Sequence, residues 1–327
     1  MLLTFDNFVM KIIGTGRAHP SKVVTNAMLE QFLDTNDEWI KTRTGITERK
    51  VISSEKLEDL AAEAALKAIQ DAGLTPKDID YIICSNVVSE YITPSLSCII
   101  QGAIGAKCAC IDVNAACSGF VYALDMADDR IKSGKAQNIL IVAAEEPTRM
   151  VDWNDRSLCV LFGDGAGAVV VSHGEGMLCS RLTAESKTDC LYYVRKLEPT
   201  PYITKEEYGA PMYMNGKEVF KTAVLSSSRD IERLLYKAGL HPSDIKYYIL
   251  HQANMRIIEA IANWLKLDMS YFPHNVDYCG NTSSASIPLL LDELAKDGKL
   301  KKGDKILMSA FGAGFTTGAC IIEWTKE

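Results

Sequence analysis

The chain has 327 residues, of which 47% are apolar and 24% are charged, a balance typical of a globular protein with large buried cores. This length favours two domains or a duplicated α/β unit. The net charge of −7 argues against a general electrostatic interaction with nucleic acid or anionic membranes, and no apolar run reaches the ~18 residues of a membrane span.

The first residues show no signal-peptide pattern. Asp6 interrupts the apolar start, and Met10 begins the first apolar run that predicts a strand, so residues 1–9 are interpreted as an N-terminal extension. The ten cysteines are scattered, without a C-x-x-C pair. We therefore expect free thiols, a reducing cytoplasm and no bound metal.

The first half contains a strand–helix junction with a cysteine in it. Residues 110–113 predict a strand, and 120–132 predict a helix with apolar residues at helical spacing. Cys117 lies between them, where the helix dipole and free N–H groups favour a reactive thiolate. The alternative is an ordinary buried cysteine, the default for any one of ten.

The chain repeats itself over long distances. Residues 67–83 and 233–249, offset by 166, each predict a helix ending in Ala-Gly-Leu, a proline turn and a strand that opens with Tyr. Residues 135–140 and 302–307 match at offset 167. We predict two α/β halves, 10–175 and 176–327, each with a mixed sheet covered by helices.

This duplication predicts that three polar residues lie close together. His251 ends the predicted strand 247–250, and Asn281 begins the second half's counterpart of the helix after Cys117. If a pseudo-twofold axis relates the halves, these residues converge on one cavity. A papain-type hydrolase would use such a set. Alternatively, His251 and Asn281 can each supply an N–H donor to an enolate oxygen.

Four motifs carry a family resemblance, namely C-S-G-F after D-V-N-A-A, H-Q-A-N, G-N-T-S-x-A-S and F-G-A-G-F-T. With D-E-W-I-K-T-R-T-G-I at 37–46 and L-F-G-D-G-A-G-A-V-V at 161–170, they resemble β-ketoacyl-acyl-carrier-protein synthase III, a condensing enzyme of the thiolase superfamily. The likeness covers nearly the whole chain from Met10. It implies a duplicated, five-layer αβαβα thiolase-like fold with Cys117, His251 and Asn281 as catalytic residues.

The resemblance implies a decarboxylative condensation that starts fatty-acid synthesis. Cys117 would take an acyl group from acyl-CoA, with the N–H groups of Cys117 and Ala313 as oxyanion hole. Malonyl-acyl-carrier protein would then be decarboxylated with help from His251 and Asn281. No cofactor is expected, and the family implies a homodimer.

The resemblance also implies binding residues. Five are expected to bind CoA: Thr35, Trp39, Arg43, Arg156 and Asn254. Another set is expected to dock the carrier protein: Gln252, Ala253, Asn254, Met255 and Arg256. Thr93 falls at an acyl-pocket position contributed across the dimer, and its small size, with Thr317 in place of a ring, predicts a longer or branched primer. Simpler interpretations are a core position for Trp39 and solvated surface charges for Arg43 and Arg156.

Two other segments are interpreted more simply. G-D-G-A-G at 163–167 precedes a strand rather than a helix, which predicts a tight backbone crossing beneath the site instead of a nucleotide loop. Residues 196–219 are predicted to cover the acyl tunnel, with an ordinary surface loop as the alternative.

Several alternative functions stay open at this stage. They are a Cys-His-Asn condensing enzyme or acyltransferase of polyketide or quinolone type, a type III polyketide synthase, a thiol hydrolase, and a non-catalytic partner subunit. The last alternative would be expected to lack the nucleophile, and Cys117 is present.

Overall fold

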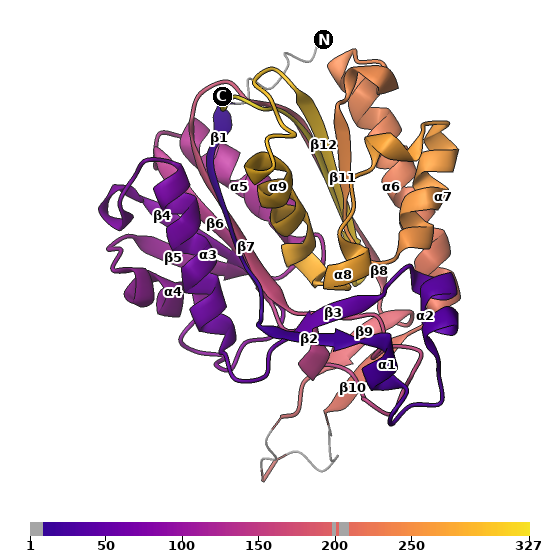
Figure 1. Ribbon diagram of the computed structural model, residues 1–327. Helices are drawn as coiled ribbons and strands as arrows, with labels where there is room; N and C mark the ends of the chain where they lie inside the picture. Colours follow the sequence, from indigo (N-terminus) through magenta and orange to yellow (C-terminus); the bar gives the residue numbers. More distant parts are fainter. Residues whose placement is uncertain (1–8, 198–200, 203–208) are drawn as a thin grey trace.

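A computed structural model describes residues 9–197, 201–202 and 209–327. Two mixed β-sheets form its framework (Figure 1). The first has the strand order β1 (Met10–Ala18), β7 (Gly165–His173), β6 (Asn138–Glu145), β4 (Tyr81–Ser85), β5 (Ala109–Val113). The second has the order β11 (Tyr247–Leu250), β12 (Lys305–Gly312), β13 (Gly314–Glu323), β8 (Met177–Lys187).

The two sheets share one pattern of strand directions. In the first, β4 and β6 are parallel, and β7 and β1 follow antiparallel. In the second, β11 and β12 are parallel, and β13 and β8 follow antiparallel. Where the first half has β5, the second has the short helices η4 (Met269–Tyr271) and α8 (Val276–Cys279). The predicted boundary at 175/176 falls between β7 and β8.

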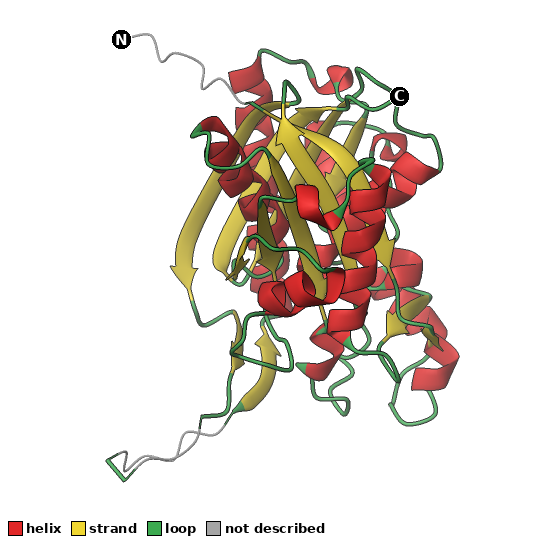
Figure 2. Ribbon diagram, turned by 90° about the vertical axis from the view of Figure 1, so that its left-hand side faces the viewer, coloured by secondary structure: helices red, strands yellow, loops and turns green. Residues whose placement is uncertain are grey.

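Helices complete a stack of five layers (Figures 1 and 2). Helices α5 (Gly119–Lys132) and α9 (Ser286–Lys296) lie between the sheets. The outer faces are covered by α3 (Leu57–Asp71) and α4 (Leu96–Ile104) on one side, and by α6 (Gly216–Ala238) and α7 (Met255–Leu265) on the other. The expected αβαβα architecture is confirmed.

The middle layer is held by a continuous apolar core. Phe120 and Leu124 of α5 and Leu291 of α9 are fully buried, and they share one core cluster with residues of both sheets. Their helical spacing turns one apolar face of each helix toward each sheet. Because burial of this apolar surface is the main stabilising contribution, the two halves form one unit.

The repeated segments fold as predicted. Helices α3 and α6 are followed by Gly73 and Gly239 in the left-handed conformation, with φ of 68° and 66°. Single turns η1 (Pro76–Asp78) and η3 (Pro242–Asp244) come next and lead into β4 and β11. Glycine tolerates the positive φ, and the proline prevents the helix from continuing.

Smaller elements gather at one end of the sheets, at the bottom of Figure 1. They are the antiparallel pair β2 (Lys22–Thr25) and β3 (Glu48–Val51), helices α1 (Asn26–Leu29) and α2 (Asp37–Thr44), and the antiparallel pair β9 (Leu191–Val194) and β10 (Ala210–Met214). We call this group the cap region. Two single turns, η2 (Pro147–Arg149) and η5 (Ser283–Ala285), follow β6 and precede α9 respectively.

The G-D-G-A-G segment is a tight crossing, as predicted. A Cβ on Gly163 would lie 2.1 Å from the carbonyl oxygen of Cys279, and one on Gly167 would lie 2.8 Å from the amide nitrogen of Leu289. Strand β7 starts at Gly165, inside the motif. Glycine is required here because two backbones touch.

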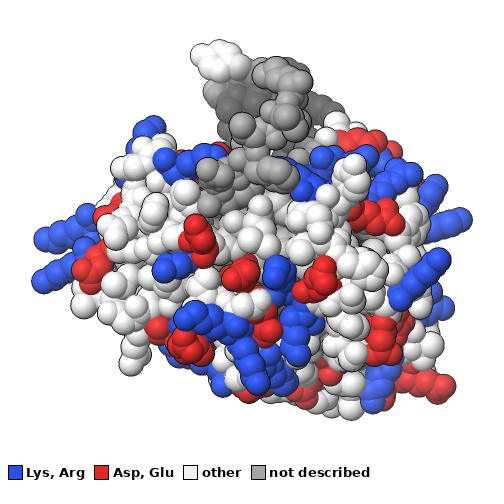
Figure 3. Space-filling model, turned by 90° about the horizontal axis from the view of Figure 1, so that it is seen from above, with Lys and Arg blue, Asp and Glu red and all other residues white. Residues whose placement is uncertain are grey.

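The surface carries charges of both signs. On the face seen in Figure 3, Lys and Arg side chains are interspersed with Asp and Glu.

Among the described residues, no helix combines the length and apolarity needed to cross a bilayer. All ten cysteines are free thiols.

Candidate active site

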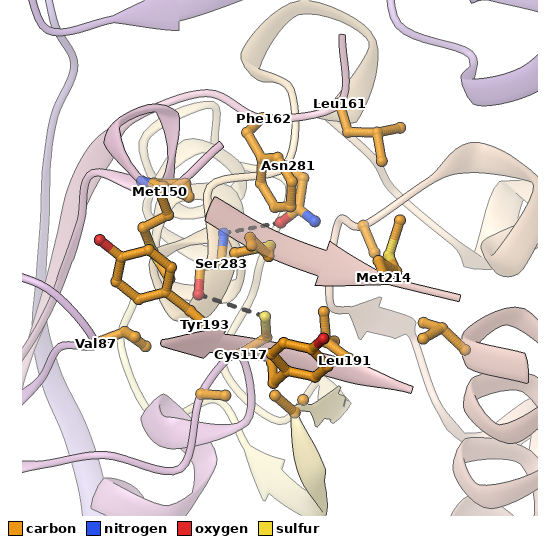
Figure 4. A pocket seen from close by; sticks show the side chains of 18 of the residues that line it. Val87, Cys117, Met150, Leu161, Phe162, Leu191, Tyr193, Met214, Asn281 and Ser283 are labelled. Carbon is orange, nitrogen blue, oxygen red and sulfur yellow. Dashed lines mark hydrogen bonds between the residues drawn. The ribbon is translucent and has the colours of Figure 1, made fainter. Parts of the chain in front are cut away.

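A cavity of about 1080 Å³ lies next to the cap region, where strand–helix junctions of both halves meet. Cys117, His251, Asn281 and Ala313 all line it. The structure therefore brings together four residues that the sequence places up to 196 positions apart. Figure 4 shows Cys117 and Asn281 on either side of Ser283.

Cys117 stands on a sharp turn between β5 and α5. Ala116 before it has a positive φ of 48°, and Ser118 after it is the residue that precedes α5. The thiol thus lies just outside the first helical turn, between the strand and the helix as the sequence predicts. The strained turn holds Cys117 out from both elements toward the cavity.

The second half repeats this turn. Ser283, 167 positions after Ala116, has a positive φ of 53° and precedes the helical run that leads into α9. Ser284 then stands where Cys117 stands in the first half, as the offset of 167 predicts. The two turns meet, because Ser283 Oγ donates a hydrogen bond to Cys117 Sγ at 3.4 Å (Figure 4).

Burial governs the ionisation of the nucleophile. It raises the pKa of the Cys117 thiol to about 12, and the hydrogen bond from Ser283 only partly opposes this shift. Burial therefore outweighs the thiolate-favouring effect that the sequence assigns to the helix end. The dipole effect is worth ~1 kcal/mol, less than the cost of burying a charge without a cation beside it.

His251 follows β11 and is only 2% exposed. Its Nδ1 lies 2.8 Å from the hydroxyl of Ser286, the first residue of α9. The ring packs edge-on against Phe311, with centroids 5.2 Å apart. Burial lowers the pKa of His251 to about 3, so the imidazole is neutral near pH 7.

Asn281 is fixed through its backbone and its side-chain oxygen. Its amide N–H donates to the carbonyl of Leu161 at 2.8 Å, and its Oδ1 accepts the N–H of Ser283 at 2.9 Å (Figure 4). Because the oxygen is engaged in the turn, the side-chain NH₂ is the group available to a molecule in the cavity.

The loop at Gly312 and Ala313 packs against the nucleophile turn. A Cβ on Gly312 would lie 2.7 Å from the amide nitrogen of Cys117 and 2.9 Å from Cβ of Ala116. Glycine at this position allows the two loops to approach so closely. Ala313, the next residue, and Cys117 both line the cavity.

Of the residues expected to bind CoA, Trp39, Arg43 and Asn254 line the cavity, and Arg156 is not among the lining residues. The guanidinium carbons of Arg43 and Arg156 lie 4.9 and 5.2 Å from the ring centre of Trp39. Arg156 also contacts the carbonyl and carboxylate of Asp34. Thr35 is also not among the lining residues.

The segment 252–256 divides into buried and exposed parts. Gln252 is fully buried and hydrogen-bonds the Leu250 carbonyl and the Asn275 amide, so its side chain cannot contact a partner on the surface. Ala253 lines the cavity. Burial removes Gln252 from the expected docking surface.

The rest of this segment is more accessible. Asn254 caps α7 through the Arg256 amide at 2.9 Å and donates to the Arg43 carbonyl at 3.1 Å. Met255 is half-buried and Arg256 is exposed. Asn254 and Arg256 line the cavity mouth together.

Two positions linked to primer size lie away from the cavity of the single chain. Thr93 is exposed and is not among the lining residues, so its acyl-pocket role depends on a second subunit. Thr317 is buried and hydrogen-bonds Asp230 of α6 at 2.7 Å. The small residue at 317 therefore fits a polar contact with α6, and it does not enlarge the cavity.

Other side chains complete the site without a sequence signal of their own. Ser283 and Ser286 belong to the G-N-T-S-S-A-S motif, but only the fold shows their contacts. Glu145, at the end of β6, had no signal in the sequence.

Apolar side chains form much of the cavity wall: Val87, Met150, Leu161, Phe162, Leu191 and Met214 (Figure 4). Met214 lies in the segment 196–219 that was expected to cover the tunnel; residues 198–200 and 203–208 lie outside the described residues.

Comparison with known proteins gives matches over nearly the full length. Family models described as 3-oxoacyl-[acyl-carrier-protein (ACP)] synthase III and its C-terminal part match residues 111–189 and 235–324. The β-ketoacyl-[acyl-carrier-protein] synthase III of Clostridium acetobutylicum is 43% identical over 97% of this chain and 99% of its own.

Solved structures agree. The 3-oxoacyl-[acyl-carrier-protein] synthase III of Aquifex aeolicus VF5 is 44% identical, with a TM-score of 0.89 over 96% of this chain and 100% of that one. The priming β-ketosynthase of the R1128 polyketide pathway is 32% identical, with a TM-score of 0.92 over 99% of both chains. The chain is 43% and 44% identical to the two synthases III but 32% identical to the polyketide enzyme. The comparison therefore does not favour the polyketide alternative.

The five-layer duplicated fold and the cavity at its strand–helix junctions define a thiolase-like condensing enzyme of the acyltransferase class. Within that class, the chain belongs to the β-ketoacyl-acyl-carrier-protein synthase III family. The resemblance found in the sequence is thus confirmed.

Proposed function

We propose that the chain condenses an acyl-CoA primer with malonyl-acyl-carrier protein, releasing CO₂ and forming a β-ketoacyl-acyl-carrier protein at the start of fatty-acid synthesis. The observation that carries this proposal is the meeting of Cys117, His251 and Asn281 in one cavity. Its apolar wall suits an acyl chain.

In the first half-reaction, Cys117 Sγ attacks the thioester carbon and CoA leaves. The amides of Cys117 and Ala313, two residues that line the cavity, act as the oxyanion hole. Fixed donors of this kind stabilise the developing negative charge without reorganising during the reaction.

In the second half-reaction, the malonyl thioester loses CO₂ and becomes an enolate. Neutral His251 and the NH₂ group of Asn281 donate to its oxygen. The carbanion attacks the acyl group on Cys117. Neither step requires a metal or redox cofactor.

The cavity mouth binds the CoA nucleotide and the carrier protein. The adenine stacks on Trp39 with Arg156 or Arg43, whose guanidinium groups already lie near that ring. Thr35 borders the nucleotide and Asn254 the pantetheine arm. Exposed Arg256, with Met255 and the Asn254 backbone, meets the acidic carrier protein.

The protein acts as a homodimer in which Thr93 of one subunit reaches the acyl pocket of the other. A cytoplasmic location, where CoA thioesters are available, stays a prediction.

The decisive experiment measures the intact mass of the protein after incubation with acyl-CoA, followed by addition of malonyl-carrier protein and product identification. Wild type is expected to gain one acyl group and then form a C–C bond. Cys117→Ala is expected to gain none, whereas Cys98→Ala, which removes an exposed free thiol, should behave as wild type. An acyl adduct that persists in Cys117→Ala would refute the proposal.

The same assay with acetyl-, isobutyryl- and octanoyl-CoA tests the primer. The apolar wall formed by Met150, Phe162 and Met214 favours primers beyond acetyl. Strict preference for acetyl-CoA would contradict this part of the proposal alone.

A further inference from the structure

A carboxylate is buried directly behind the nucleophile. Glu145 is 1% exposed and is not among the residues that line the cavity. Its Oε1 accepts hydrogen bonds from Ser284 Oγ at 2.5 Å and Ser283 Oγ at 3.3 Å, and its Oε2 accepts the amide N–H of Val87 at 3.2 Å. A substrate in the cavity would meet Ser283 and not Glu145.

The hydroxyl of Ser283 links this carboxylate to the nucleophile. It lies 3.4 Å from Cys117 Sγ and 3.3 Å from Glu145 Oε1. A hydroxyl has one proton and can donate to one acceptor fully at a time. Donation to Sγ and donation to the carboxylate are therefore alternatives. When Ser283 turns its proton to Glu145, it can accept from the thiol, which makes a two-step path from Sγ to Oε1.

The neighbour Ser284 is committed to a different role. Its Oγ accepts a hydrogen bond from Ser85 at 2.9 Å and donates its own proton to Glu145. Ser284 thus anchors the carboxylate, and Ser283 remains the group that connects it to Cys117.

Glu145 is better suited than His251 to act as a general base near neutral pH. Its nearest polar contacts are the hydroxyls of Ser283 and Ser284 and the amide of Val87, and its charge in turn helps to raise the pKa values of the Cys117 and Cys84 thiols. Burial raises the pKa of Glu145 to about 7, whereas that of His251 is lowered to about 3. A general base works best when its pKa is near the working pH.

We propose that Glu145, acting through Ser283, accepts the proton of the Cys117 thiol during acylation and returns it when the acyl group leaves. This step rests on the proposed function. Glu145 is thereby a proton-holding residue that touches no substrate, and Ser283 is the relay.

The proton balance closes over the cycle. As the bond from Cys117 Sγ to the acyl carbon forms, the thiol proton moves to Ser283 Oγ and the Ser283 proton moves to Glu145. The bond between the acyl carbon and the CoA sulfur breaks, and the CoA thiolate takes a proton from solvent. In condensation the acyl carbon leaves Sγ, and Glu145 returns its proton by the same path.

The test is the pH dependence of the single-turnover acylation rate between pH 5.5 and 9, in wild type, Glu145→Gln, Ser283→Ala and the double variant. Wild type should show an inflection near pH 7. Each variant should lose that inflection and slow by about 100-fold at pH 7, the typical contribution of a general base. The double variant should be no slower than either single one, because the two residues act as a unit.

A second acyl donor separates this proposal from the proposed function. p-Nitrophenyl acetate requires proton loss from Cys117 but no CoA recognition, so the same profiles are expected with it even if acyl-CoA fails. Thermal unfolding checks each variant; if Glu145→Gln does not fold, Ser283→Ala, which keeps the carboxylate, decides alone. A retained inflection, or losses that multiply in the double variant, would overturn the relay.

Discussion

Nδ1 of His251 and the hydroxyl of Ser286 lie 2.8 Å apart, although they belong to the end of β11 and the start of α9. Ser286 Oγ also accepts the backbone N–H of Gln252 at 3.2 Å. When Ser286 donates its own proton to Nδ1, the imidazole proton is on Nε2. That tautomer is the one able to donate to an oxygen in the cavity.

Ser286→Ala is expected to slow condensation about three- to tenfold, the effect of losing one neutral hydrogen bond of ~1 kcal/mol, and to leave Cys117 acylation unchanged. The two half-reactions are measured separately by stopped assays. Ser226→Ala is the matched control, because that hydroxyl bonds only carbonyls of its own helix. If acylation and condensation slow equally, Ser286 does not act through His251.

Asn281→Ala is expected to reduce decarboxylation of malonyl-carrier protein by ~100–1000-fold, as for loss of one oxyanion donor, and acylation much less. Asn281→Asp keeps the acceptor for the Ser283 amide but removes the NH₂ donor, so it should show the same selective loss. Equal loss of both half-reactions in these variants would mean that Asn281 mainly holds the turn.

Trp39→Ala is expected to raise the KM for acyl-CoA about tenfold with little change in kcat, since stacking with a cation contributes ~1–2 kcal/mol in ground and transition states alike. Acylation by p-nitrophenyl acetate, which has no nucleotide, serves as control and should be unaffected. A comparable loss with p-nitrophenyl acetate would show that Trp39 supports the fold of the cap region instead.

Asp164 should make stability depend on pH. Burial raises its pKa to about 7, although Ile52 and Thr148 donate hydrogen bonds to it. Between pH ~4 and 7 the folded state therefore holds a proton that the unfolded state has lost, and this contribution to stability falls as pH rises.

Asp164→Asn has no titrating carboxyl at this position, so this decrease in stability with rising pH is absent from the variant. The difference in free energy of unfolding should shift in favour of the variant by up to ~1.4 kcal/mol per pH unit from pH 5 to 7, measured by denaturant titration. Thr148→Val keeps the carboxyl and should keep the wild-type dependence. A pH-independent difference for Asp164→Asn would contradict the raised pKa.

Much of the architecture could be predicted from local patterns. The helix 120–132 is observed as Gly119–Lys132, and both Ala-Gly-Leu segments end helices at a left-handed glycine. These features depend on residues within one or two turns of each other. The repeat then predicted that Cys117, His251 and Asn281 meet, because equivalent junctions of two related halves must face each other.

The sequence by itself determined the duplication, the family and the identity of the candidate nucleophile. Only the tertiary structure decided that Cys117 rests as a thiol, that Gln252 is enclosed, and that Glu145 lies behind Ser283. The reason is that burial and hydrogen-bond partners come from segments far apart: Ser283 and Glu145 are 138 positions apart. No local pattern encodes such a contact, yet it sets the pKa values on which the chemistry depends.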